Sequence, residues 1–194
     1  VTAVTDEHKH EAVVQAPSNE DTYDGTEKSA GTELTGTTFQ WKGQTYRIEG
    51  LTSANVTKTD AGEYENKVNG TAKVLDAAGN DVTAQFKVTT KVGKLTIKKR
   101  QVTLRSSDAK KEYDGTALTK DEVKVTSGSF ADKEGYTATT SGSQTLVGTS
   151  ANKFNYELNK GTKAANYEIK TVNGTLEVTA VTDEHKHEAV VQAP

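Results

Sequence analysis

Residues 37–48 read TTFQWKGQTYRI, and this stretch decides the fold class. Two runs rich in β-forming residues lie on either side of Lys42-Gly43-Gln44, which has the composition of a tight turn. Apolar residues alternate with polar ones in both runs: Phe39, Trp41, Tyr46 and Ile48. Because side chains of a strand alternate between its two faces, the stretch predicts a β-hairpin with one apolar face.

The same alternation recurs along most of the chain, and no segment keeps a helical period over three turns. Further runs of this kind contain the following residues: Leu95 and Ile97, Val102 and Leu104, Val123 and Val125, Phe154, Tyr156 and Leu158, and Tyr167 and Ile169. The 16 glycines and the abundant threonines fit short strands joined by tight turns. The chain is therefore expected to be all-β.

The composition limits the size of the core. Only 32% of the 194 residues are hydrophobic and the mean hydropathy is −0.71, although seven Tyr, four Phe and one Trp are spread along the chain. Such a chain can fill small, thin cores but not one large core. We expect two modest domains.

The segment from Asp60 to Tyr64 resembles the tyrosine corner of immunoglobulin domains, with Asn66 at the place of the second cysteine. It favours two tandem small β-sandwich (immunoglobulin-like) modules in an elongated array. About 40 residues follow Tyr64, which is too many for the last two strands of an immunoglobulin domain. A β-grasp-like arrangement with mixed sheets is therefore the alternative.

Residues 1–17 and 178–194 are identical: both read VTAVTDEHKHEAVVQAP. The period from one copy to the next is 177 residues. This exceeds the roughly 20–50 residues of solenoid and propeller units, so each period should contain whole domains. We interpret the chain as one repeat of a tandem array, followed by the start of the next repeat.

A weaker repeat lies inside the period. Residues 22–26, with Tyr-Asp-Gly-Thr, recur at 112–116; residues 61–68 align with 147–154, and 92–97 with 173–178. The period therefore holds two diverged copies of one module. The expected division is 1–17 as junction segment and first strand, 18–104 as first module, 105–180 as second module, and 181–194 as the start of the next repeat.

The two junctions differ in sequence. Residues 98–101 join the modules without Pro, Gly or Ser, which predicts a stiff connection. The charged run Asp-Glu-His-Lys-His at 6–10 is expected to be an exposed connection, with Ala12 to Gln15 as the first strand. Bending of the array is expected around the second copy of this charged run, at 183–187.

The Tyr-Asp-Gly-Thr openings, the segments 128–133 and 147–152, and the close at 166–178 resemble the YDG and MBG repeat domains of bacterial, typically Gram-positive, cell-surface adhesins. The resemblance covers the second module almost end to end and is looser in the first. It implies an extracellular stalk repeat of a cell-wall-anchored adhesin that projects a distal binding domain. The alternative is that the repeat itself binds a host glycan or protein.

The histidines form two His-x-His pairs, His8 with His10 and their duplicates His185 with His187, and they are weak candidates for a metal site. No third or fourth ligand is evident in the sequence. A solvated, charged connection explains the run better than metal binding does. No metal and no cofactor is therefore expected.

The Tyr-Asp-Gly motifs, Tyr23-Asp24-Gly25 and Tyr113-Asp114-Gly115, are interpreted as structural turns rather than catalytic acids. An intramolecular Lys–Asn crosslink between Lys110 or Lys111 and Asn173 is a minor hypothesis. The aromatic candidates for a binding surface are Trp41, Tyr46 and Tyr136.

The remaining composition excludes several function classes. The chain has no cysteine, its net charge is −3, and lysine and glutamate are interleaved, so neither a thiolate site nor a basic face for nucleic acid is expected. No apolar run reaches the roughly 20 residues of a membrane span. No nucleophile motif or phosphate-binding loop is present, so no enzymatic activity is expected. The expected partners are neighbouring copies of the repeat.

Overall fold

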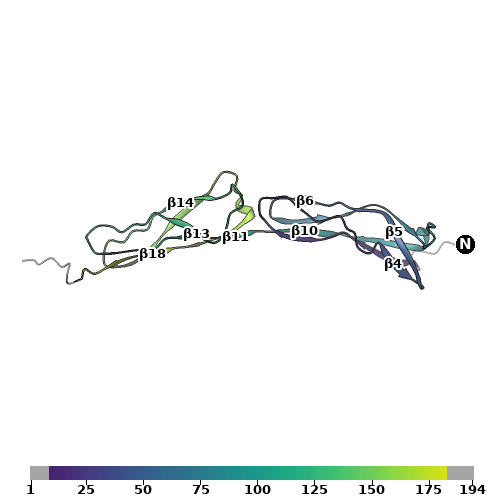
Figure 1. Cartoon of the computed structure of the whole chain (residues 1–194), viewed down its shortest axis with the longest axis horizontal. Helices are drawn as coiled ribbons and strands as arrows, with labels where there is room; N and C mark the ends of the chain where they lie inside the picture. Colours follow the sequence, from purple (N-terminus) through teal and green to yellow (C-terminus); the bar gives the residue numbers. More distant parts are fainter. Residues whose placement is uncertain (1–8, 183–194) are drawn as a thin grey trace, which may run out of the picture. The chain divides into compact units, whose positions relative to one another are not determined.

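The computed structural model describes residues 9–182, and this part of the chain is all-β. Its strands form several small sheets without a closed barrel, and no helix in the described part has seven or more residues. The chain divides into two compact units, Val1–Lys99 and Arg100–Pro194 (Figure 1). The prediction of an all-β class is confirmed.

Within the described residues, the first unit contains ten strands and one short 3-10 turn: β1 (His10–Gln15), β2 (Asn19–Thr22), β3 (Lys28–Ser29), β4 (Thr38–Trp41), β5 (Gln44–Ser53), β6 (Thr57–Lys58), β7 (Gly62–Asn66), β8 (Val68–Leu75), η2 (Thr83–Gln85), β9 (Phe86–Lys91) and β10 (Gly93–Lys98). The first strands described in this unit are β1 and β2, and its last strands are β9 and β10. β1 pairs in parallel with β9, and β2 pairs in parallel with β10. β7 covers the other edge of β10 in the antiparallel direction.

The predicted hairpin at 37–48 is confirmed as β4 and β5, with Phe39 opposite Tyr46. Its turn residues Lys42 and Gly43 have φ values of 50° and 76°, the pattern of a type I′ turn. β5 continues into a ladder with β8. One face of this three-stranded sheet packs on β1 and β9, and the buried side chains between them form the main core of the unit: Ala12, Val14, Tyr46, Ile48, Val74 and Phe86.

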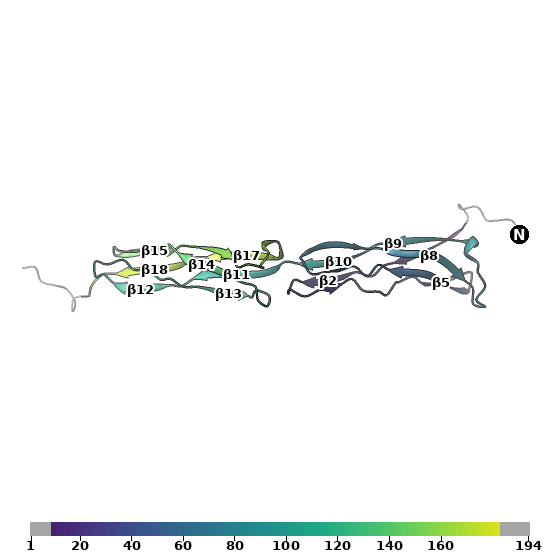
Figure 2. The same ribbon diagram turned by 90° about the horizontal axis from the view of Figure 1, so that it is seen from above.

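The second unit, as far as Thr182, contains eight strands and one 3-10 turn: β11 (Arg100–Ser106), β12 (Ala109–Glu112), β13 (Val123–Gly128), β14 (Tyr136–Thr140), β15 (Gly148–Asn152), β16 (Phe154–Leu158), η3 (Ala164–Asn166), β17 (Tyr167–Val172) and β18 (Gly174–Thr179). β11 pairs in parallel with β17, and β12 pairs in parallel with β18. β15 covers the other edge of β18 in the antiparallel direction (Figure 2).

The two units therefore share one frame. In each, an interrupted first strand runs parallel to an interrupted last strand, and an antiparallel strand flanks the end of the last strand. The parallel pairs give each unit mixed pairing, with parallel and antiparallel neighbours of the same strand. The choice between an immunoglobulin-like sandwich and a β-grasp-like arrangement stays a prediction. The tyrosine-corner hydrogen bond is nevertheless present, because the Tyr64 hydroxyl donates to the Asp60 carbonyl at 3.0 Å.

The expected module boundaries need correction. Among residues 9–182, β11 pairs only with β13 and β17, so Arg100 to Leu104 belong to the second unit and not to the first. β1 is an integral strand of the first unit, which therefore begins before residue 18. The strand expected at Ala12 to Gln15 is found and extends back to His10. One residue, Lys99, lies between β10 and β11; the stiffness of that junction stays a prediction.

Candidate functional site

Asp24 closes a tight turn after β2. Its Oδ1 accepts hydrogen bonds from the Thr26 amide at 2.8 Å and from the Thr26 hydroxyl at 2.6 Å, while Lys28 Nζ lies 2.5 Å from Oδ2. Gly25 has a φ of 84°, which an L-residue rarely adopts. Hydrogen bonds hold the pKa of the Asp24 carboxyl well below its usual range; the bond from Lys28 has the largest effect and those from Thr26 come next. The carboxylate is fully engaged in an Asx turn.

Asp114 forms the same turn in the second unit. Its Oδ1 accepts from the Thr116 amide at 2.9 Å and the Thr116 hydroxyl at 2.8 Å, and Gly115 has a φ of 82°. Here the ammonium comes from Lys111, on the preceding strand, at 2.7 Å. Hydrogen bonds lower the pKa of Asp114 well below its usual range; the bond from Lys111 has the largest effect and those from Thr116 come next. Neither aspartate has the raised pKa that a general acid would need.

The tyrosines of the two motifs have different surroundings. Both main-chain amides donate to the end of the last strand, from Tyr23 to the Lys98 carbonyl and from Tyr113 to the Thr179 carbonyl, each at 2.9 Å. Tyr23 is 3% exposed, whereas Tyr113 is 39% exposed. The motif therefore has one backbone role in both units but leaves an exposed ring only in the second.

A buried asparagine, which sequence reasoning did not identify as a key residue, connects several loops of the first unit. Asn66 is fully buried. Its Nδ2 donates to the Pro17 carbonyl at 3.0 Å and to the Ser53 hydroxyl at 2.9 Å, and its Oδ1 accepts from the Val56 amide at 3.2 Å. Pro17 lies in the interruption between β1 and β2, so Asn66 holds that interruption in place.

Asn152 occupies the same place in the second unit. It is also fully buried, and its Nδ2 donates to the carbonyls of Ser107 and Lys120, both at 2.9 Å. Ser107 lies in the interruption between β11 and β12. The Oδ1 of Asn152 has no partner among the described residues. The signal in the sequence was the alignment of 61–68 with 147–154, which pairs the two asparagines.

Of the four histidines, the structure describes only His10; His8, His185 and His187 lie outside the described residues. The expectation that His10 lies in an exposed connection was wrong. His10 begins β1 and is half-buried. Its ring stacks at 5.8 Å on both Phe39 and Trp41. Within residues 9–182, no three His, Cys, Asp or Glu side chains are grouped so that they could hold a metal ion.

The three aromatic residues considered for a binding surface differ in burial and in surroundings. Tyr46 is buried in the core of the first unit. Trp41 is half-buried, with His10 stacked on its ring and Lys42 Nζ 4.3 Å from the ring centroid. Tyr136 lies in the second unit, where its hydroxyl donates to the Val123 carbonyl at 2.9 Å. The expectation that these rings are exposed was wrong for Tyr46.

Of the residues of the hypothetical Lys–Asn crosslink, Lys110 and Asn173 are exposed and Lys111 is half-buried. Lys110 pairs with Glu177 at 3.0 Å, and Lys111 pairs with Asp114. Asn173 is exposed in the short connection between β17 and β18. These groups do not share a buried site with an acid, which the crosslink would require.

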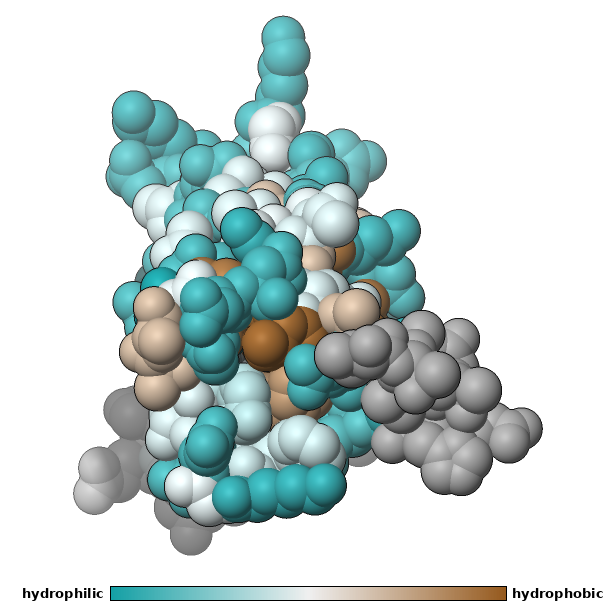
Figure 3. Space-filling model, turned by 90° about the vertical axis from the view of Figure 1, so that its right-hand side faces the viewer, coloured by the Kyte–Doolittle hydropathy of each residue, from teal (hydrophilic) through white to brown (hydrophobic). Residues whose placement is uncertain are grey.

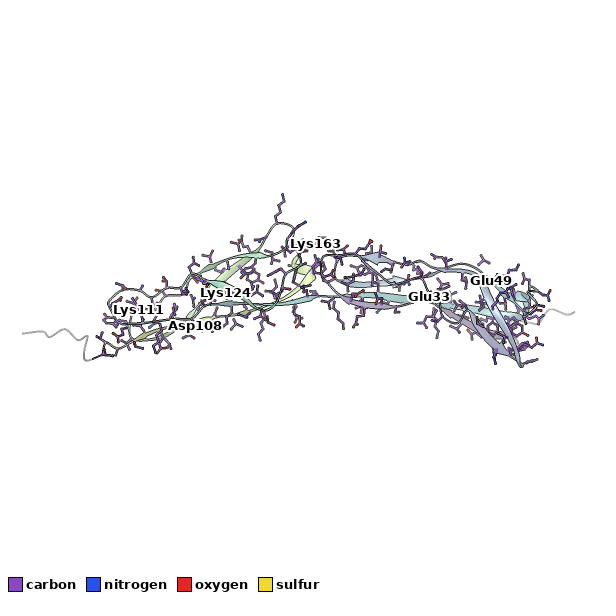
Figure 4. All side chains as sticks on the ribbon, viewed as in Figure 1. Glu33, Glu49, Asp108, Lys111, Lys124 and Lys163 are labelled. Carbon is purple, nitrogen blue, oxygen red and sulfur yellow. The ribbon has the colours of Figure 1, made fainter. Side chains whose placement is uncertain are left out.

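Some of the hollows on the described surface are wide open and have mixed polar and apolar linings. One lies beside β11 and β12, where Arg105 binds Asp108 and Lys110 binds Glu177, so its charged groups already have partners. Figure 4 shows Asp108, Lys111 and Lys124 in the second unit and Glu33 and Glu49 in the first, with carboxylates and ammonium groups interspersed.

None of the helices among the described residues is long and apolar enough to cross a membrane. Comparisons of the chain with protein-family models, with curated proteins and with solved structures found no match. The resemblance to surface repeat domains, which rests on short motifs, therefore stays a prediction.

Proposed function

We propose that this chain is a structural repeat of the stalk of a bacterial surface adhesin. In this proposal the parent protein is extracellular and attached to the cell wall, and the repeats project a distal binding domain from the cell. The proposal includes no enzymatic activity. Its partners are the neighbouring copies of the repeat.

The observation that carries the proposal is the parallel pairing of first and last strands within each unit. Because parallel strands begin at the same end of a sheet, the chain enters a unit at one end and leaves it at the other. An antiparallel pair would return the chain to its starting end. The last strand of the first unit runs from Phe86 to Lys98, which corresponds to roughly 40 Å at the usual rise per residue.

The same pairing suits a chain under tension. Pulling on the two ends of a unit slides its first strand along its last strand. The hydrogen bonds of a parallel ladder are evenly spaced and would be loaded together rather than one after another. Each unit has two such ladders in series, β1 with β9 and β2 with β10 in the first. Resistance to extension is what a stalk needs.

Small-angle X-ray scattering on chains of one, two and three periods tests the proposal. The maximum dimension should increase by a constant amount, about 80 Å for the two units of each period. A radius of gyration that grows only as that of a compact particle would contradict the stalk. Specific binding of a host glycan or protein by a single 177-residue period would favour the adhesive alternative instead.

A further inference from the structure

Three large apolar side chains are exposed around the C-terminal end of β18. They are Tyr113, Leu146 and Val147, with exposed fractions of 39%, 69% and 56%, and we call them the trailing patch. Tyr113 follows β12 and donates its amide to Thr179. Val147 precedes Gly148, which pairs with Val178. The patch therefore flanks the end of β18 from both sides, as β12 and β15 do in Figure 2.

The first unit carries no such apolar group at the matching place. The alignment of 61–68 with 147–154 puts Asp60 and Ala61 where the second unit has Leu146 and Val147. Single exposed apolar side chains are ordinary on protein surfaces. In the first unit the corresponding residues are an aspartate, a small alanine and the buried Tyr23. A group of three large exposed apolar side chains beside the last described strand therefore indicates a surface that another part of the protein covers.

The duplicated sequence identifies the folded unit that comes after the patch. The repeat begins again at Val178, within β18, so in a tandem array the next folded unit is a copy of the first unit. This step rests on the proposed function. β1 begins at His10, the tenth residue of the repeat, which leaves about seven residues between the end of β18 and the next first unit. Even a fully extended segment of that length spans at most roughly 25 Å.

The first unit offers a complementary surface at the end where β1 begins. His10, Phe39 and Trp41 stack there and are only half-buried. Figure 3 views this end and shows apolar residues gathered at its centre between hydrophilic ones. We call it the leading end. Aromatic rings of this kind contribute much of the contact energy at protein interfaces.

We propose that the trailing patch of one repeat docks on the leading end of the next repeat, with Leu146 and Val147 covered by the next copies of His10, Phe39 and Trp41. The junction between repeats is then an apolar contact. Its partner is the following copy of the first unit and not a host molecule.

Amide hydrogen exchange tests the docking in two chains: the 194-residue chain, and a chain in which residues 1–177 are followed by a complete copy of 1–99. In the longer chain, exchange between Thr145 and Gly148 should slow by about tenfold, because the docked unit shields this loop. The double variant Leu146→Ser, Val147→Ser should lose this slowing. The same variant should unfold in urea at the same midpoint as the parent 194-residue chain.

Val92→Ser is the matched control, because Val92 is an exposed valine that lies outside the patch. It should leave the slowing unchanged. Equal exchange at 145–148 in the two chains would overturn the docking proposal. If the maximum dimension measured by scattering still increases by a constant amount per period, the stalk proposal holds without docking. If the longer chain is compact, the stalk proposal is wrong whatever the hydrogen exchange shows.

Discussion

Asn66 and Asn152 show how a single side chain can set the course of a β-strand. Each is buried, and each donates to a carbonyl in the interruption of the first strand of its unit, at Pro17 and at Ser107. Polar groups in the interior are costly unless they are hydrogen-bonded. The asparagine amide donates a hydrogen bond to a backbone carbonyl that has no strand partner at the interruption.

Asn66→Ala should lower the stability of the first unit by about 2–3 kcal/mol, because the Pro17 carbonyl and the Val56 amide lose their partner. Trp41, the only tryptophan, lies in this unit, so urea unfolding followed by its fluorescence reports on this unit. Asn69→Ala, at an exposed position of β8, is the control and should change little. Equal shifts for the two variants would show that the buried amide is not essential.

Glu122 gives the second unit a dependence on pH. Its carboxylate binds Lys124 at 2.8 Å and accepts from the Ser107 hydroxyl at 2.6 Å. The pKa of Glu122 is lowered from 4.5 to about 2; the hydrogen bond from Lys124 has the largest effect and the one from Ser107 comes second. Because the folded pKa is the lower one, the contribution is fully present above pH 4.5 and is lost as the pH falls through about 2.

Glu122→Gln should therefore be slightly less stable than the parent chain at pH 7, and the difference should disappear between pH 4.5 and 2. The effect should be small and should shrink in high salt, because the pair is at the surface. Urea midpoints measured across this pH range check it. Glu157→Gln, at an exposed carboxylate of β16, serves as control; a difference that grows at low pH would contradict the assignment.

At the scale of elements, each unit depends on two interrupted strands lying side by side. Glycine begins the second part of each last strand, Gly93 in β10 and Gly174 in β18. A Cβ at Gly93 would lie 2.0 Å from the Pro17 carbonyl oxygen, and one at Gly174 would lie 2.4 Å from the Ser106 carbonyl oxygen. The interruption of the first strand can therefore approach only where the last strand has no side chain.

Gly174→Ala should destabilise the second unit by about 2–3 kcal/mol, because the new methyl group meets backbone atoms that cannot move aside. Thermal unfolding followed by the amide signals of the second unit measures the loss. Gly135→Ala is the control in the same unit, since its Cβ would meet only the flexible end of Asn159, at 3.2 Å. A Gly174→Ala chain as stable as the control would show that the close approach relaxes readily.

At the scale of the whole molecule, each unit has its own set of buried side chains. In the first unit the main cluster includes Val14, which is fully buried on β1. In the second unit the buried residues of β11 and β18 include Leu104 and Leu176. Two separate cores predict that one unit can unfold while the other stays folded.

Val14→Asp should unfold the first unit, because an unpaired carboxylate would be buried in an apolar cluster. The amide signals of residues 100–182 should stay dispersed, while the Trp41 environment becomes that of an unfolded chain. Val13→Asp is the control, because Val13 is the exposed neighbour on the same strand. Loss of both units together would show that they fold as one.

The sequence by itself determined the local features. The period of two placed most strands; Lys42-Gly43 specified the hairpin turn, and the aspartates formed Asx turns with residues two positions later in the chain. These features depend on side chains only a few positions apart. The duplicated seventeen residues likewise needed no structure to be recognised.

Only the tertiary structure decided how the strands associate. Asn66 and Pro17 lie far apart in the chain, and nothing local indicates that one caps the other. The alternation of Val102 and Leu104 marks a strand but not the unit to which the strand belongs, and for that reason the expected boundary was misplaced. Parallel pairing of first and last strands, the burial of Tyr23 and the exposure of Tyr113 result from contacts between distant segments, which local pattern cannot specify.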